Sequence, residues 1–272
     1  MSLTMKFCIN QATTMETDFD TDVRAYAAAG FEGVELWLDK AETMLPRRSP
    51  RDLAKLVADH GLTVAGACFQ GGLMGTDDAK VRSAQSKLQS KLELCTAVGA
   101  PVLIVPTDFP ETLDPNAYEI AAECLRQAAD LAQGFGVKLA VEFIRRSKLV
   151  SSLDTANRLV KQVGRDEVGI LFDIFHFWTG SSKESDIETI PEAKLFFVHV
   201  NDCPDRPREH LVDADRTYTG YGVVPVRHIV DRLRATGYDG WLSLEIFNRQ
   251  IWKHDPFEVA RIAHKTMSEV LA

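Results

Sequence analysis

The sequence lacks the features that mark membrane, secreted and nucleic-acid-binding proteins. It has no apolar run of about 18 residues, the minimum for a membrane-spanning helix. Its first residues, MSLTMKFCIN, lack the long apolar stretch of a signal peptide. A formal net charge of −8 disfavours attraction to nucleic acid or to an anionic membrane. We therefore expect a soluble, cytoplasmic protein that binds neither.

Cysteine is scarce and shows no pairing pattern. The five cysteines include no C-x-x-C pair, and an odd number cannot be fully paired within one chain. We expect reduced thiols packed in the core, in strands for Cys8 and Cys68 and in helices for Cys95 and Cys124. No neighbouring residue supplies the base that a thiol nucleophile needs, so cysteine catalysis is not expected.

A dinucleotide-binding motif, a linker and a sequence repeat are also absent, since no G-x-G-x-x-G follows the first strand-like run. Short apolar runs instead alternate with helical stretches, such as residues 20–30, 49–61 and 78–98. The expected strands are 6–10, 33–37, 63–69, 101–106, 139–143, 168–176, 195–202 and 242–247. Eight such units favour a single-domain (β/α)8 TIM barrel over residues 1–272 rather than an open sheet.

The last four runs each carry a polar side chain at the downstream end, namely Glu142, Asp173, His199 and Glu245. A carboxylate or imidazole in a buried strand is costly unless it is paired, hydrogen-bonded or bound to a metal. A lone glutamate at a strand end is usually structural, but four polar residues at equivalent places need a common explanation. Because barrel strand ends converge, we expect all four to bind one divalent metal. Three oxygen donors and one nitrogen suit Mn²⁺, Mg²⁺, Co²⁺ or Zn²⁺.

Such a metal suggests chemistry on a sugar-like ketone. It would bind a carbonyl oxygen and the neighbouring hydroxyl, and its charge would stabilise the enediolate formed when a proton leaves carbon. Glu142 and Glu245 are the candidates for the two carboxylates that take and return this proton, while Asp173 and His199 mainly hold the metal. The expected partner is a small-molecule polyol ketone or ketose.

Other residues are candidates for substrate contacts. His176 follows Asp173 by three residues and would point away from it, unless the strand has already ended. It binds a substrate oxygen or has a structural role. Arg216 lies in the long segment 203–224, which we expect over the carboxyl face of the barrel, and it either reaches the substrate or is solvated. Asp202 either orients a metal ligand or makes an edge contact. Glu35, Trp37 and Gln70 are candidates for the pocket wall or for contacts that support a metal ligand. Further candidates for the pocket wall are Phe69, Trp178 and Trp252.

Several segments carry a resemblance that spans nearly the whole chain: MKFCINQATTMET, VKLAVEF, RDEVGILFDIFHFW, FFVHVND, LVDADRTYTGYG and SLEIF. The chain resembles the xylose-isomerase-like TIM barrels of the sugar isomerase and epimerase superfamily. This resemblance implies a metal on Glu142, Asp173, His199 and Glu245, a substrate contact by His176, and a place in inositol catabolism.

The resemblance leaves alternative reactions open. The leading hypothesis is an isomerase that moves the carbonyl of an inosose, 2-keto-myo-inositol, to the neighbouring carbon through a cis-enediolate. A ketose 3-epimerase would form the same enediolate, and a dehydratase acting on an inosose or on 3-dehydroshikimate could use His176 as its acid. A DNA-repair endonuclease is disfavoured by only seven histidines and the negative net charge. The intact ligand set disfavours a noncatalytic barrel.

Overall fold

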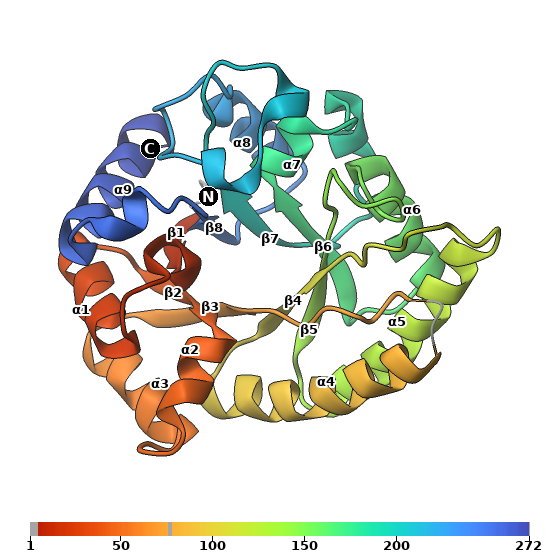
Figure 1. The fold of residues 1–272 in the computed structure, drawn as a ribbon, viewed down its shortest axis with the longest axis horizontal. Coiled ribbons are helices and arrows are strands. Elements are labelled where there is room, and N and C mark those ends of the chain that lie inside the picture. Colours follow the sequence, from red (N-terminus) through yellow and green to blue (C-terminus); the bar gives the residue numbers. More distant parts are fainter. Residues whose placement is uncertain (1–4, 76–77, 272) are drawn as a thin grey trace. The chain divides into compact units, whose positions relative to one another are not determined.

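The computed structural model describes residues 5–75 and 78–271 and confirms the predicted fold class. Its eight parallel strands follow one another in sequence order in a closed (β/α)8 barrel (Figure 1). The strands are β1 (Lys6–Asn10), β2 (Gly33–Trp37), β3 (Thr63–Cys68), β4 (Val102–Pro106), β5 (Lys138–Glu142), β6 (Val168–Asp173), β7 (Leu195–Val200) and β8 (Trp241–Leu244).

Helices alternate with the strands, as the sequence pattern predicts. They are α1 (Phe19–Ala29), α2 (Leu38–Met44), α3 (Pro50–Asp59), α4 (Asp78–Val98), α5 (Ala117–Gln133), α6 (Leu153–Val163), α7 (Ile174–Thr179), α8 (Val226–Ala235) and α9 (Pro256–Leu271). The described residues also form short 3-10 helices, namely η1 (Gln11–Thr14), η2 (Glu184–Thr189), η3 (Arg208–His210), η4 (Asp213–Asp215) and η5 (Ile251–Lys253). Within the described ranges, none of the helices is both long enough and apolar enough to span a bilayer.

Local sequence signals explain where helices begin and end. At the start of α3, Ser49 and Asp52 form a reciprocal capping box and Pro50 occupies the first turn. At the end of α1, Gly30 adopts a left-handed conformation (φ 93°) and its N–H caps the last carbonyls. Only glycine takes this conformation without steric cost, so the helix ends there.

The contacts group the chain into two compact units. The central unit is Ala67–Phe197, and the terminal unit is Met1–Gly66 with Val198–Ala272. In the terminal unit, β1 pairs with β2 and β8, and His199 of β7 is in register with Ser243 of β8. In the central unit, β5 pairs with β4 and β6. The assignment of residues 1–272 to one domain stays a prediction.

Predicted strand ends required one main correction. The strand expected over residues 168–176 stops at Asp173, where α7 begins, because the Asp173 carboxylate accepts the backbone N–H of His176 (3.0 Å) and caps the helix. β8 also stops earlier than expected, at Leu244, so Glu245 lies just beyond it. The predicted apolar interior is confirmed, since all six residues of β6 are buried.

The expectation of free thiols is confirmed for the described residues, and the expected core packing is confirmed for Cys8, Cys68 and Cys95 but not for Cys124. All five cysteines are free, and only Cys124 is partly exposed. Burial raises the pKa of Cys95 to about 12 and that of Cys203 to about 11. Thiolates are therefore scarce at neutral pH, which disfavours cysteine nucleophiles.

Candidate metal centre and active site

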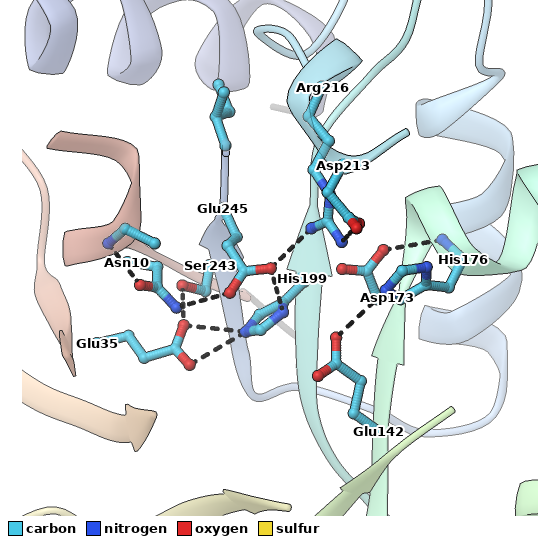
Figure 2. A network of polar contacts seen from close by, with 12 residues as sticks. Asn10, Glu35, Glu142, Asp173, His176, His199, Asp213, Arg216, Ser243 and Glu245 are labelled. Carbon is cyan, nitrogen blue, oxygen red and sulfur yellow. Dashed lines mark hydrogen bonds and ion pairs between the residues drawn. The ribbon is translucent and has the colours of Figure 1, made fainter. Parts of the chain in front are cut away.

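In the terminal unit, two candidate metal ligands lie against each other. His199 is the last residue but one of β7, Glu245 directly follows β8, and both are buried. Nδ1 of His199 lies 3.2 Å from Oε2 of Glu245 (Figure 2). Burying these two groups next to each other is favourable only if a proton or a cation lies between them, which makes the pair a candidate for metal binding.

Further contacts orient the Glu245 carboxylate. Asn10 donates its side-chain amide to Oε1 (3.1 Å), and Arg216 donates Nη1 to Oε2 (2.7 Å). The two donors act on different oxygens (Figure 2). They fix the rotation of the carboxylate about its own axis, which is the preorganisation that an acid/base group needs.

Arg216 belongs to the buried network rather than to the solvated loop surface. Its side chain is 1% exposed, pairs with Asp213 (3.2 Å) as well as Glu245, and lies 5.5 Å above the ring of Phe247. Its backbone carbonyl accepts the side-chain amide of Asn248. Of the two predicted alternatives, the solvated arginine is therefore wrong, and substrate contact by Arg216 stays a prediction.

Glu35, predicted to line the pocket or to support a metal ligand, contacts the candidate ligand His199. Both of its carboxylate oxygens lie 3.1 Å from Nε2 of His199, and Oε2 also accepts the Ser243 hydroxyl (2.6 Å). Trp37, two residues on, makes an edge-to-face contact with Phe247 (5.8 Å between ring centroids). Glu35 and Trp37 are two residues apart on β2, so their side chains lie on the same face of the strand. Of the two, only Glu35 is fully buried.

The short helix η1 holds the start of the chain beside Glu245. Asn10 caps η1 by accepting the Ala12 N–H (2.8 Å). Thr13 donates its hydroxyl to the Leu244 carbonyl (3.0 Å) and accepts the Ile246 N–H (3.2 Å), so it bridges the residues on either side of Glu245. A shift of η1 would therefore move the Glu245 carboxylate.

An ion pair between the partly buried Lys40 and the buried Asp22 supports η1. Nζ of Lys40 lies 2.7 Å from Asp22 and also donates to the Thr14 carbonyl (2.7 Å). Asp22 accepts from the side chains of Gln11 and Thr14 as well. Burial raises the pKa of Asp22 to about 6, against the opposing effect of Lys40. These contacts anchor η1 to α1 and α2.

In the central unit, the other predicted site residues lie together. Glu142 ends β5, Asp173 ends β6, and both are buried. His176, on α7 and 4% exposed, places Nε2 3.9 Å from Glu142 and donates its backbone N–H to Asp173. The chain turns directly after Asp173, so His176 lies beside both carboxylates rather than on the opposite face of a strand.

The remaining pocket-wall candidates have mixed outcomes. Gln70 is buried and lines a cavity of about 570 Å³ in the central unit with Gly71, Ser83 and Lys87. Trp252 lines a cavity of about 300 Å³ in the terminal unit, and its indole N–H donates to the Ala12 carbonyl (2.8 Å). Phe69 is 37% exposed, with the Lys91 ammonium 5.4 Å from its ring.

Asp202 organises the long segment 203–224. Its carboxylate accepts four backbone N–H groups at 2.8–3.0 Å, those of Cys203, Gly220, Gly222 and Val224. A Cβ on Gly222 would collide with the Cys203 carbonyl, which explains glycine there. Burial raises the pKa of Asp202, against the effect of these amides. Asp202 also forms a backbone bridge with Thr217, so the predicted edge contact is the alternative that the structure shows.

Asp202→Ala is expected to lower the free energy of unfolding by about 1–3 kcal/mol, because it leaves buried backbone N–H groups without an acceptor. Urea denaturation followed by circular dichroism would measure the loss. The control is Asp205→Ala, an exposed aspartate of the same segment. Equal stabilities of the two variants would contradict the anchoring role.

The comparisons with known proteins agree with this architecture. Residues 23–269 match the xylose isomerase-like TIM barrel family. The chain belongs to this family. It is 28% identical to an inosose isomerase from Bacillus velezensis, in an alignment that covers 98% of each protein. It is also 28% identical to a 3-dehydroshikimate dehydratase from Pseudomonas aeruginosa, over 83% of this chain and 36% of that protein.

A solved structure resembles the whole chain. The crystal structure of the IOLI protein with a bound zinc atom superposes with a TM-score of 0.93 at 25% identity, covering 98% of both chains. The relatives named above are enzymes, and this family member is an enzyme as well. A metal-binding relative and the donors described here together support binding of a divalent metal.

The donor chemistry suits such a metal. The central unit offers the carboxylates of Glu142 and Asp173, and the terminal unit offers Nδ1 of His199 and the carboxylate of Glu245. All four residues are at most 8% exposed. Oxygen donors with one imidazole fit Mn²⁺, Mg²⁺, Co²⁺ and Zn²⁺ and no cysteine is needed.

Sequence reasoning missed three residues that act on the site, namely Asn10, Thr13 and Ser243. Asn10 and Thr13 occur in MKFCINQATTMET, one of the segments that carry the family resemblance, which was a usable signal. Ser243 begins SLEIF, another of these segments, but a serine next to the last residue of a strand is common and points to no particular partner. Its role depends on the cross-strand register with His199.

Proposed function

We propose that this protein is an inosose isomerase that converts 2-keto-myo-inositol into a 1-keto-inositol through a cis-enediolate. One divalent metal would be held by Glu142, Asp173, His199 and Glu245. The observation that carries the proposal is the presence of these four buried donors at the ends of four consecutive strands. The similarity to inosose isomerase over 98% of the chain supports the substrate class.

The reaction requires two proton transfers at carbon. A base removes the proton from the hydroxyl-bearing carbon, and an acid delivers a proton to the former carbonyl carbon while the hydroxyl proton moves to the other oxygen. Glu142 and Glu245 are the two carboxyl groups for these steps. The metal, when bound, supplies positive charge near the substrate oxygens.

Neighbouring residues orient the acid/base groups and the substrate. Arg216 and Asn10 hold Glu245 by separate oxygens, which keeps its carboxylate in one rotation during proton transfer. His176 lies beside Glu142 and Asp173 and would donate a hydrogen bond to a substrate oxygen. The proposed substrate is a small polyol ketone. We also propose that the protein is located in the cytoplasm.

Proton exchange with solvent tests the function. The Mn²⁺-loaded enzyme is incubated in D₂O with 2-keto-myo-inositol. Parallel reactions contain D-fructose, D-tagatose or 3-dehydroshikimate. The paramagnetic Mn²⁺ is removed before proton NMR of the products. We expect a 1-keto-inositol with deuterium at the old carbonyl carbon. A C3 epimer formed only from the ketohexoses would instead assign a 3-epimerase, and loss of water from inosose or 3-dehydroshikimate would assign a dehydratase.

A further inference from the structure

The buried cluster of Glu35, His199 and Ser243 extends the site to a strand that carries none of the four donors. Glu35 lies on β2, His199 on β7 and Ser243 on β8, and all three side chains are 0% exposed. Register pairs His199 with Ser243, and Figure 2 shows the Glu35 carboxylate joined to both side chains by dashed lines. The three groups lie within the terminal unit.

The contacts determine which ring nitrogen of His199 carries its hydrogen. Both oxygens of Glu35 lie 3.1 Å from Nε2. When Glu35 is ionised, its oxygens only accept hydrogen bonds, and Nε2 is then the donor. In a neutral imidazole the other nitrogen, Nδ1, then presents a lone pair. Nδ1 is the nitrogen that lies 3.2 Å from the candidate ligand Glu245.

Ser243 holds the Glu35 carboxylate, which determines the position of the hydrogen on His199. Its hydroxyl donates to Oε2 of Glu35 at 2.6 Å, so Oε2 receives both the serine and the histidine. A buried carboxylate with two donors has little freedom to rotate, and its charge increases the electron density of the ring that it contacts. Packing alone does not explain a glutamate, a histidine and a serine here, because apolar side chains would fill the same space without the free-energy cost of burying polar groups.

We propose that Glu35, held by Ser243, is a positioning residue that keeps the hydrogen of His199 on Nε2 and directs the lone pair of Nδ1 toward the metal. The inference rests on the proposed metal site of the isomerase. It concerns how this chain prepares His199 as a ligand, and it assigns Glu35 no contact with substrate.

Glu35→Gln removes the negative charge of the side chain and leaves its shape nearly unchanged, so it tests the effect of the charge rather than that of the shape. If the glutamine oxygen keeps the Ser243 bond, its NH₂ group faces Nε2 and donates to it, which drives the hydrogen of His199 to Nδ1. We expect Mn²⁺ affinity, measured by isothermal titration calorimetry, to fall about 10- to 100-fold. Glu32→Gln is the matched control, because Glu32 is an exposed glutamate three residues earlier, and it should bind Mn²⁺ like the wild type.

Imidazole ¹⁵N NMR of the Zn²⁺-loaded wild type gives a readout that does not depend on activity. We expect the hydrogen of His199 on Nε2 and the metal on Nδ1. The opposite arrangement would overturn the inference, as would unchanged Mn²⁺ affinity in a folded Glu35→Gln protein. If that variant does not fold, Ser243→Ala replaces it; a smaller loss of affinity is expected, and no loss would overturn the inference.

Failure of the proposed function is distinguishable from failure of the positioning role. A wild type that binds Mn²⁺ on His199 Nδ1 but does not exchange protons with 2-keto-myo-inositol would contradict only the isomerase assignment. Turnover of the inosose with the hydrogen of His199 on Nδ1 would contradict only the role of Glu35. A wild type that binds no metal would contradict both.

Discussion

Glu245→Gln is expected to lower kcat by at least about 10³-fold while the protein stays folded. General acid/base groups contribute roughly 10²- to 10⁴-fold, and here the same carboxylate is also a proposed metal ligand. The amide cannot take a proton from carbon at neutral pH. The fold should survive because glutamine has nearly the same shape and its oxygen can still accept from Arg216, which also keeps Asp213 as a partner.

Steady-state turnover of 2-keto-myo-inositol and deuterium uptake from D₂O would measure this loss. Circular dichroism would check the fold. Glu209→Gln is the control, since Glu209 is an exposed glutamate of the segment that also carries Arg216. Near-normal turnover in Glu245→Gln would rule out Glu245 as part of the acid/base pair, whatever the outcome for Glu142.

Removal of divalent metal is expected to abolish turnover and to lower the melting temperature. A ligand present at 100 times its Kd stabilises the folded state by about 2.7 kcal/mol. For a chain of this size that corresponds to roughly 5–10 °C in Tm. Part of the expected effect follows from the proposal that Glu142, Asp173, His199 and Glu245 bind the metal, because these buried polar groups would then lose a partner when it is removed.

Differential scanning calorimetry of chelator-treated protein, before and after addition of Mn²⁺, Mg²⁺, Co²⁺ or Zn²⁺, would measure the shift. Glu142→Gln should lose most of the metal-induced gain in Tm. Glu119→Gln should keep it, because Glu119 is an exposed residue of α5 in the same unit. A chelator-treated enzyme with full activity and unchanged Tm would contradict the metal site.

Periodicity and strand-end chemistry predicted most of the frame of this protein. Parallel strands buried on both faces require continuous apolar runs, so the eight strands could be located to within a few residues. The same rule makes a glutamate or histidine in such a run conspicuous, which is why Glu142, Asp173, His199 and Glu245 could be selected. Only the ends of the strands were misjudged, as at Asp173, because a side-chain cap ends β6 before the apolar pattern does.

The partners of those residues could not be predicted from the sequence. Glu35 and Ser243 are separated by 208 residues, and Asn10 and Glu245 by 235, so no local pattern relates them. Arg216 is surrounded in sequence by polar loop residues, which favoured a solvated side chain, yet the fold buries it between Glu245 and Phe247. Burial is a property of the assembled strands and loops, and composition near a residue does not report it.

The sequence by itself therefore determined the barrel, the family and the identity of the candidate metal donors. Both the spacing of apolar residues and a charged residue inside an apolar run can be recognised in the local sequence. Only the tertiary structure decided which donor faces which partner, which nitrogen of His199 is directed toward Glu245, and how Asp202 holds the long segment. Those outcomes depend on hydrogen-bond distances and cross-strand register between residues far apart in sequence, and both come into existence only when the strands pair.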